Sequence, residues 1–239
     1  MTSCFSCFSG CFSTLRRQKR SAALDYVKLQ EDSGSKHPGV KGVQEALGAS
    51  SQLPIICVLG GTKFQNAISE PLIQALAAEF KKELSERVQV VTGGMNGVQE
   101  KFASGLDGFK PAVVHLMPQG EVPKYPHGAA IVLHAGKNLD ERKDIFGQLG
   151  SIYLCIEGGP GVAKEATGAY ERGAKVLPVK YTGGASGGQF NFPAGALDKP
   201  DFATVEQWEQ LEKKCPADNM RGHTSATAKV IVQLIKRLI

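Results

Sequence analysis

The first candidate for a functional side chain is Glu165 in the segment CIEGGPGVAKEATGAYERG. It lies one helical turn beyond a glycine-rich turn. An apolar strand-like segment runs into Gly158 and Gly159, and a helix pattern follows. Glycine lets a ligand approach the backbone closely, and the start of a helix offers N–H groups and a positive dipole end. The turn therefore predicts a phosphate site, and Glu165 is a catalytic group, a sugar ligand or a solvated residue of the first helical turn.

Glycine pairs also end two other apolar segments. Gly60–Gly61 closes LPIICVLGG, and Gly93–Gly94 closes RVQVVTGG and leads into MNGVQ. The carboxyl ends of parallel strands share one edge of a sheet, so we expect all three pairs to lie at that edge. Tight turns alone could explain each pair, but the repetition favours a site for a nucleotide or sugar phosphate. The residues that we predict to bind this ligand through these turns are Gly60, Gly61, Thr62, Gly93, Gly94, Asn96, Gly97, Gly158, Gly159 and Gly161.

The elements that position these turns alternate along the chain. Strand-like segments occupy residues 53–61, 87–94, 111–118, 129–136, 151–159 and 174–181. Helical spacing follows at 68–84, 95–106, 138–150 with Asn138 as its cap, 162–172, 205–214 and 225–238. This order predicts an α/β fold: a doubly wound, mainly parallel, Rossmann-like sheet of about six strands with helices on both faces.

Other enzyme classes lack their motifs here. No G-x-x-x-x-G-K-[ST] sequence is present, the turn GGTKFQN is not G-x-G-x-x-G, and no acidic residue ends the second strand. The histidines are dispersed, and GGASGG is not a G-x-S-x-G nucleophile elbow. We therefore expect no metal and no cofactor. The glycine-rich loop at 182–200 is either a mobile flap over the site or an excursion without a role.

Two segments, VQVVTGGMNGVQEKFASG and DERKDIFGQLGSIYLCIEGGPGVAKEATGAYERGAKVLPV, resemble the "lonely guy" family, also labelled lysine-decarboxylase-like. That family comprises nucleoside 5′-monophosphate phosphoribohydrolases, and the resemblance covers roughly residues 54–180. Its pattern is E-R-K followed by P-G-G-x-G-T-x-x-E. Arg142 precedes Glu165 by 23 residues, the spacing between the arginine and the glutamate that the family uses in catalysis. The resemblance thus implies that Arg142 and Glu165 are catalytic, that Lys143 and the residue at 162 bind the ligand, and that the protein is a homodimer.

In that reaction a carboxylate stabilises an oxocarbenium-like state or activates the attacking water. Arg142 would hold Glu165 ionised and bind the phosphate or the base. The segment DERKD is also typical of an ordinary charged helix surface, on which Arg142 would pair with Asp140 or Glu141.

The sequence also departs from the family pattern. Glu157 stands where the family has proline, Pro160 occupies the variable position, and Val162 replaces a threonine whose hydroxyl helps to hold the phosphate. We expect weaker phosphate binding without that hydroxyl, and repulsion if Glu157 faces the ligand. The turns also resemble those of a wider group: nucleotide-sensing domains of DNA-uptake proteins, molybdenum-cofactor carriers and melastatin-type channels. The alternative function is therefore a non-catalytic nucleotide sensor or carrier.

Residues 1–52 differ from the rest of the chain and predict a disordered tail and linker before a domain at 53–239. Of the net charge of +5, RRQKR supplies four charges, so the folded part is nearly balanced and shows no footprint for nucleic acid. Cys4, Cys7 and Cys11, interspersed with phenylalanines before this basic cluster, favour S-acylation and peripheral membrane contact of a cytoplasmic protein. The alternatives are incidental cysteines or an organelle transit peptide.

Overall fold

The computed structural model describes residues 39–48, 52–126, 128, 130–216 and 218–239. The chain divides into two units at residues 36 and 37, and the described residues all belong to the second unit, residues 37–239. The predictions for Cys4, Cys7, Cys11 and the basic cluster lie outside the described residues. No helix in the described ranges is long and apolar enough to cross a membrane.

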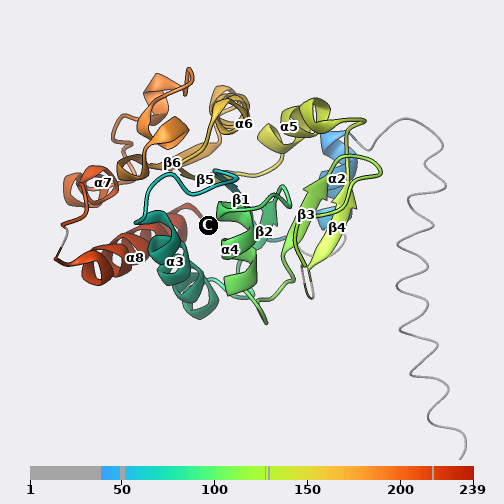
Figure 1. Cartoon of the computed structure of the whole chain (residues 1–239). Helices are drawn as coiled ribbons and strands as arrows, with labels where there is room; N and C mark the ends of the chain where they lie inside the picture. Colours follow the sequence, from blue (N-terminus) through green and yellow to red (C-terminus); the bar gives the residue numbers. More distant parts are fainter. Residues whose placement is uncertain (1–38, 49–51, 127, 129, 217) are drawn as a thin grey trace, which may run out of the picture. The chain divides into compact units, whose positions relative to one another are not determined.

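One six-stranded sheet forms the centre of the second unit (Figure 1). Its strands are β1 (Ile55–Gly60), β2 (Gln89–Thr92), β3 (Val114–Met117), β4 (Ile131–His134), β5 (Ile152–Ile156) and β6 (Lys175–Val179). The spatial order is β4-β3-β2-β1-β5-β6, and every neighbouring pair is parallel. The predicted doubly wound, Rossmann-like α/β fold is confirmed.

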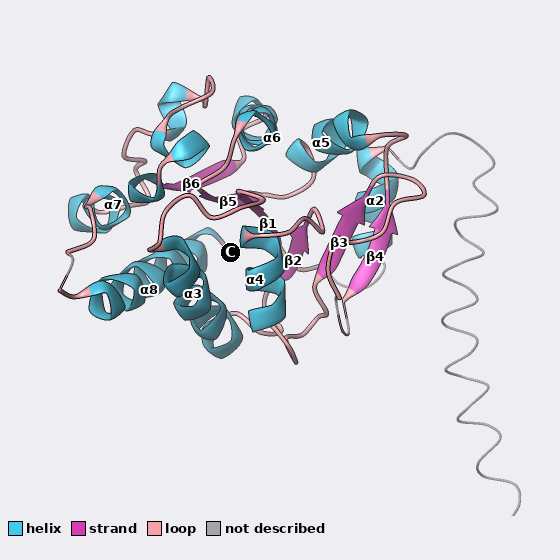
Figure 2. Ribbon diagram, in the orientation of Figure 1, coloured by secondary structure: helices cyan, strands magenta, loops and turns pink. Residues whose placement is uncertain are grey.

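Helices cover both faces of the sheet (Figure 2). The described residues form α2 (Val40–Gly48), α3 (Ser69–Glu83), α4 (Val98–Gly105), α5 (Leu139–Gly147), α6 (Pro160–Glu171), α7 (Val205–Glu212) and α8 (Met220–Leu238). Figure 1 shows α3, α4 and α8 on one face and α5 and α6 on the other. The predicted cap of α5 is present, because the Asn138 side chain accepts hydrogen bonds from the N–H groups of Asp140 and Glu141.

Successive side chains of β5 point to opposite faces of the sheet and pack against the helices on each face. Ile152, Leu154 and Ile156 belong to the large apolar cluster with α3, α4 and α8. Tyr153 points to the opposite face, where its hydroxyl donates to the carbonyl of Phe146 in α5. A strand buried on both sides reads as a continuous apolar segment, which is why the sequence alone located it.

Helix α2 was not predicted, because it lies in the range that we assigned to the linker. Its side chains Val43 and Leu47, one helical turn apart, are buried, and Gln44 Nε2 donates to the carbonyl of Leu149 at 3.3 Å. Two buried side chains within a short segment that a polar, glycine-rich stretch surrounds are a weak signal of a helix. The folded unit thus begins before residue 53.

The direction in which strands are added reverses between β1 and β5. From β1 the chain continues through α3 to β2 on one side, and from β5 it continues through α6 to β6 on the other. Ligands of open parallel sheets bind in the crevice at the carboxyl ends of such a strand pair. The glycine pairs after β1, β2 and β5 lie at this edge, as predicted.

Candidate functional site

Arg142 of α5 and Glu165 of α6 form a buried ion pair. Their exposed fractions are 2% and 5%, and Arg142 Nη1 lies 2.8 Å from Glu165 Oε1. The two helices approach closely because Gly147 has no side chain: a Cβ there would lie 2.9 Å from the carbonyl oxygen of Glu165. Arg142 is therefore not the charge on an exposed helix surface that the segment DERKD could have indicated. Glu165 is likewise not a solvated residue of the first helical turn.

The guanidinium of Arg142 also lies against the turn that follows β2. A Cβ at Gly93 would be 2.8 Å from Arg142 Nη1, so only glycine admits the guanidinium at this place. The ring centroid of Phe146 lies 5.5 Å from Arg142 Cζ. Arg142 Nε is buried and has no hydrogen-bond partner among the described residues. A buried donor without a partner is costly in free energy, which is typical of a group that completes its contacts with a ligand or water.

The environment of Glu165 changes its acidity. Burial raises the pKa of the Glu165 carboxyl to about 7, and the charges of Arg142 and Lys143 oppose that rise. Desolvation therefore outweighs the ion pair, and Glu165 exchanges its proton near neutral pH. A carboxyl group with such a pKa can accept and return a proton during a reaction.

The N-terminus of α6 is open to an anion. The N–H groups of Gly159, Gly161 and Val162 make no hydrogen bond within the described part of the chain. The first turn of α6 contains no acidic residue, and a Cβ at Gly161 would lie 3.4 Å from Lys143 Cε. Free N–H groups, the helix dipole and a neighbouring lysine all favour a phosphate here.

The glycine-rich segment after β6 holds this turn in place. The carbonyl of Gly158 accepts from Ala185 N at 2.8 Å, and the carbonyl of Glu157 accepts from Ser186 N at 3.1 Å and Ser186 Oγ at 2.9 Å. Ala185 and Ser186 are buried. This part of the 182–200 loop is therefore packed under the site and does not act as a flap over it.

Four N–H groups of the turn after β2 already donate to acceptors within the chain. Gln99 Oε1 accepts from the N–H groups of Gly93 and Met95, each at 3.1 Å, and Gly94 N donates to Thr92 Oγ1. Gly97 N donates to Glu100 Oε2 at 3.3 Å. The predicted ligand residues Gly93, Gly94 and Gly97 thus lie at the expected edge, but their N–H groups bind internal acceptors. Asn96 is exposed beside them.

The side chain of Glu157 reaches the segment between β1 and α3. Its Oε2 accepts from Gln65 N at 3.0 Å, and its Oε1 accepts from Asn66 N at 2.9 Å and Ser69 Oγ at 2.6 Å. Internal hydrogen bonds therefore fix the Glu157 carboxylate, the group that was expected to repel a ligand that it faces. Sequence reasoning identified the residue but not its partners, which lie about 90 positions away in the chain.

Gly60, Gly61 and Thr62 complete the predicted edge. Gly60 permits α4 to pack, since a Cβ there would lie 2.3 Å from Val98 Cγ1. At Gly61 a Cβ would lie 3.1 Å from Glu157 Oε2, and Thr62 is exposed. The structure brings the three turns to one edge and leaves the turn before α6 as the best anion site among them.

A family profile matches most of the folded part of this chain, at residues 53–209. The chain belongs to the SLOG cluster4 family. The match confirms the grouping that the glycine-rich turns predicted. No curated protein matches the sequence.

One solved structure has a fold similar to that of this SLOG cluster4 protein, and two others match it over about half of the chain. The X-ray structure of TM1055, a structural genomics target, is 21% identical with a TM-score of 0.53, and the match covers 77% of this chain and 99% of that chain. The molybdenum cofactor binding protein of Rippkaea orientalis is 20% identical with a TM-score of 0.45, covering 52% and 75%. The molybdenum cofactor carrier protein of Chlamydomonas reinhardtii is 19% identical with a TM-score of 0.43, covering 52% and 75%.

In this SLOG cluster4 protein Val162 occupies the first turn of α6 with an exposed fraction of 7%. A Cβ at Gly158 would lie 2.6 Å from Val162 Cγ2, so valine packs on the turn. It offers its N–H group to a ligand but no hydroxyl. The backbone part of the predicted phosphate contact is therefore available, and the side-chain part is absent.

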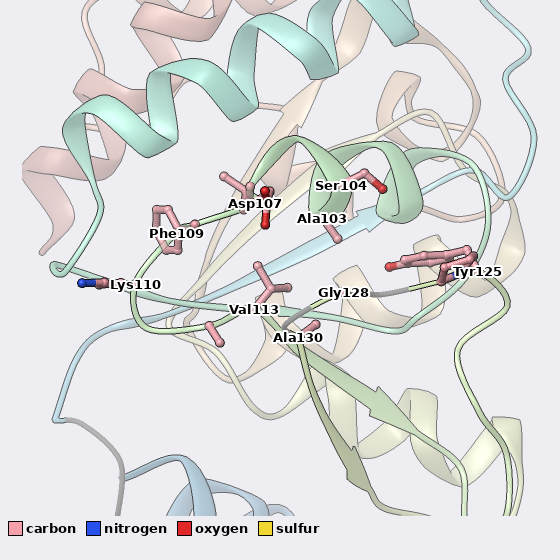
Figure 3. Close-up of a pocket in the computed structure, with 13 residues that line it drawn as sticks. Ala103, Ser104, Asp107, Phe109, Lys110, Val113, Tyr125, Gly128 and Ala130 are labelled. Atoms are coloured by element: carbon pink, nitrogen blue, oxygen red, sulfur yellow. The ribbon is translucent and has the colours of Figure 1, made fainter.

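Two cavities of this SLOG cluster4 protein lie outside the paired residues. A cavity of about 350 Å³ lies between α4, the segment leading into β3, and Tyr125, at the amino ends of the strands (Figure 3). A second one, of about 490 Å³, follows the outer surface of α5 and α6 and includes Lys143 but neither Arg142 nor Glu165. Among the described residues, no group of three or more histidine, cysteine, aspartate or glutamate side chains could hold a metal ion.

Proposed function

We propose that the protein binds a nucleotide or sugar phosphate and hydrolyses the N-glycosidic bond of a nucleoside 5′-monophosphate, releasing a free base and ribose 5-phosphate. The observation that carries this proposal is the buried ion pair of Arg142 and Glu165, whose side chains lie 2.8 Å apart. Glu165 follows Gly161, at the open N-terminus of α6, by about one helical turn. Membership of the SLOG cluster4 family and the sequence resemblance support a nucleotide-type ligand.

The phosphate would accept hydrogen bonds from the N–H groups of Gly159, Gly161 and Val162, with Lys143 as its counter-charge. The ribose would then lie toward Glu165, because Glu165 follows these groups within one turn of the same helix. The guanidinium of Arg142, bounded by Gly93 and Glu165, would contact the ligand through its unpartnered Nε.

Cleavage breaks the bond between the anomeric carbon and the base nitrogen. The electron pair leaves with the nitrogen, which takes up a proton, and water supplies the hydroxyl group on the anomeric carbon. Glu165 would stabilise the cationic transition state and accept the proton of the attacking water. Its pKa of about 7 suits this exchange at neutral pH.

The test is incubation of the full chain with nucleoside monophosphates of the common and modified bases, with detection of free base and ribose 5-phosphate. We expect release from at least one substrate and a loss of about 100-fold or more in kcat for Glu165→Gln. Glu171→Gln is the matched control, because Glu171 is an exposed glutamate of the same helix. Equal activity of the two variants would rule out the role of Glu165, and no product from any substrate would rule out the hydrolase.

A non-catalytic sensor or carrier is the second candidate, and the observation that favours it is Val162, which removes the hydroxyl from the phosphate site. Such a protein would be stabilised by a nucleotide without turnover. A ligand at a hundredfold excess over Kd raises the free energy of unfolding by about 2.7 kcal/mol. A thermal shift with an unchanged nucleotide would support this candidate, and product formation would contradict it.

By the same family resemblance we propose that two copies associate in solution. Light scattering should then give twice the 25.5 kDa mass of one chain. A mass of a single chain at micromolar concentration would contradict the proposal.

A further inference from the structure

Glu157 fills the crevice between β1 and β5, where an open parallel sheet would otherwise receive its ligand. The residue directly follows β5, its exposed fraction is 1%, and its side chain reaches the segment 65–69 at the start of α3. The hydrogen-bond partners of its carboxylate are two backbone N–H groups and the hydroxyl of Ser69, a set of donors typical of a bound phosphate. The protein thus supplies its own anion at this place.

The backbone at Glu157 is arranged around this role. Its φ is +53°, in the left-handed region that favours glycine. Its N–H group donates to Thr182 Oγ1 at 2.9 Å, and its carbonyl oxygen accepts from Ser186. Main chain and side chain are both fixed, so the carboxylate stays in the crevice.

The start of α3 offers little to a second anion. Ser69 N donates to the Asn66 carbonyl, Ile68 N donates to Asn66 Oδ1, and Pro71 has no N–H group. Glu70 adds another carboxylate to the first turn. The N-terminus of α6 differs from the start of α3, because it has free N–H groups and no acidic residue in its first turn.

We propose that Glu157 is a specificity-determining residue that closes the β1–β5 crevice to a second phosphate, so that ligands with a single phosphate are accepted and ligands with a pyrophosphate are rejected. Glu157 lies only three residues before Pro160, the first residue of α6, so a second phosphate that extends from this N-terminus into the crevice would meet a fixed carboxylate. Charge repulsion opposes that arrangement, and the donors that hold Glu157 are not available to the second phosphate. This inference rests on the proposed binding of a nucleotide phosphate at α6.

The experiment compares Kd values for pairs of nucleoside mono- and diphosphates of the four common bases, measured by calorimetry on the full chain. For each base that binds, we expect the monophosphate to bind at least about tenfold more tightly, a difference of about 1.4 kcal/mol. Glu157→Gln should reduce this preference to about threefold or less. Glu157→Gly should do the same, and it suits the positive φ, so it keeps the test valid if the glutamine variant does not fold.

Two controls distinguish the effect of the Glu157 charge from a general loosening of the segment 65–69. Ser69→Ala removes one donor to Glu157 but keeps the carboxylate, so it should lower the melting temperature and leave the preference unchanged. Glu171→Gln removes a remote exposed glutamate and should change neither. Equal binding of mono- and diphosphates by the wild type, or an equal loss of preference in Ser69→Ala, would overturn the proposal.

The outcome is separable from the hydrolase assay, because these measurements need binding and not turnover. Discrimination by Glu157 without cleavage would overturn only the hydrolase. Cleavage without discrimination would overturn only the role of Glu157. If no nucleotide binds, this inference and the phosphate site at α6 both fail.

Discussion

At the scale of single residues, burial decides what Glu165 can do. A glutamate in the first turns of a helix is ordinarily solvated, and its charge is favoured by the helix dipole. Here α5 and α6 enclose the carboxyl group, and its closest cation is the equally buried Arg142. Desolvation raises the pKa to about 7 in spite of that cation. The pair is consequently a weak source of stability but a suitable acid–base group.

The raised pKa predicts how stability depends on pH. The folded protein retains the Glu165 proton up to about pH 7, whereas the unfolded chain loses it near the ordinary value of 4.5. The stabilisation linked to this proton is complete below pH 4.5 and is lost as the pH rises through about 7. Relative to Glu165→Gln, the wild type should therefore lose up to about 3 kcal/mol between these values. Urea unfolding at a series of pH values measures this, and parallel curves for the two proteins would contradict it.

At the scale of elements, three turns with similar sequences play different roles. Glu157 accepts hydrogen bonds from N–H groups after β1, and Gln99 accepts them from N–H groups after β2. The free N–H groups at the start of α6 have no such acceptor in the described part of the chain. Gln99 connects two elements, since its Oε1 holds the turn after β2 and its Nε2 donates to the carbonyl of Val58 in β1 at 3.0 Å. It thereby sets the position of Gly93, against which the guanidinium of Arg142 rests.

Replacing Gln99 should disturb both stability and the site. Gln99→Leu would remove the acceptor of the N–H groups of Gly93 and Met95 and the side-chain donor to the carbonyl of Val58, at a cost of about 3 kcal/mol. Gln99→Glu keeps the acceptor oxygens and should cost less. Chemical denaturation of these variants, with the exposed Gln119→Leu as the matched control, measures the effect. The interpretation fails if Gln99→Leu is no less stable than Gln119→Leu.

At the scale of the whole molecule, the doubly wound sheet gathers residues from distant parts of the sequence at one edge. The turns after β1, β2 and β5 lie there because all six strands are parallel and the order reverses between β1 and β5. The ion pair is brought to the same edge by α5 and α6, which precede and follow β5. A cavity at the opposite edge, beside Tyr125, shares none of these residues (Figure 3).

The tail of the molecule carries a prediction that rests on the sequence alone. We propose that acyl chains on Cys4, Cys7 and Cys11, together with the basic cluster RRQKR, attach the protein to membranes. In cells with protein S-acyltransferases, replacing the three cysteines by serine should shift the protein from the membrane fraction to the supernatant. Cys215→Ser, a half-buried cysteine of the folded part, should leave it unchanged. Equal partitioning of all three proteins would contradict the proposal.

Local patterns were sufficient to predict the six strands, six of the seven helices in the described residues, and the shared edge of the glycine pairs. The apolar segments are long enough to identify buried strands, and the glycines mark where they end. The pairing of Arg142 with Glu165 was implied by the resemblance to the "lonely guy" family, whose catalytic arginine and glutamate have the same 23-residue interval. Helix α2 was not predicted because its segment resembles a linker in composition and buries only Val43 and Leu47.

The tertiary structure decided which of these residues are free to act. Glu157 and Val162 both depart from the family pattern in sequence, yet only the contacts show that the first is engaged by Gln65, Asn66 and Ser69. Such hydrogen bonds join positions about 90 residues apart, so no local pattern contains them. The acidity of Glu165 likewise depends on packing from two helices and not on its neighbours in the chain. The sequence by itself determined the elements and the candidates, because periodicity and turn chemistry are local, whereas burial and hydrogen-bond partners exist only once the chain has folded.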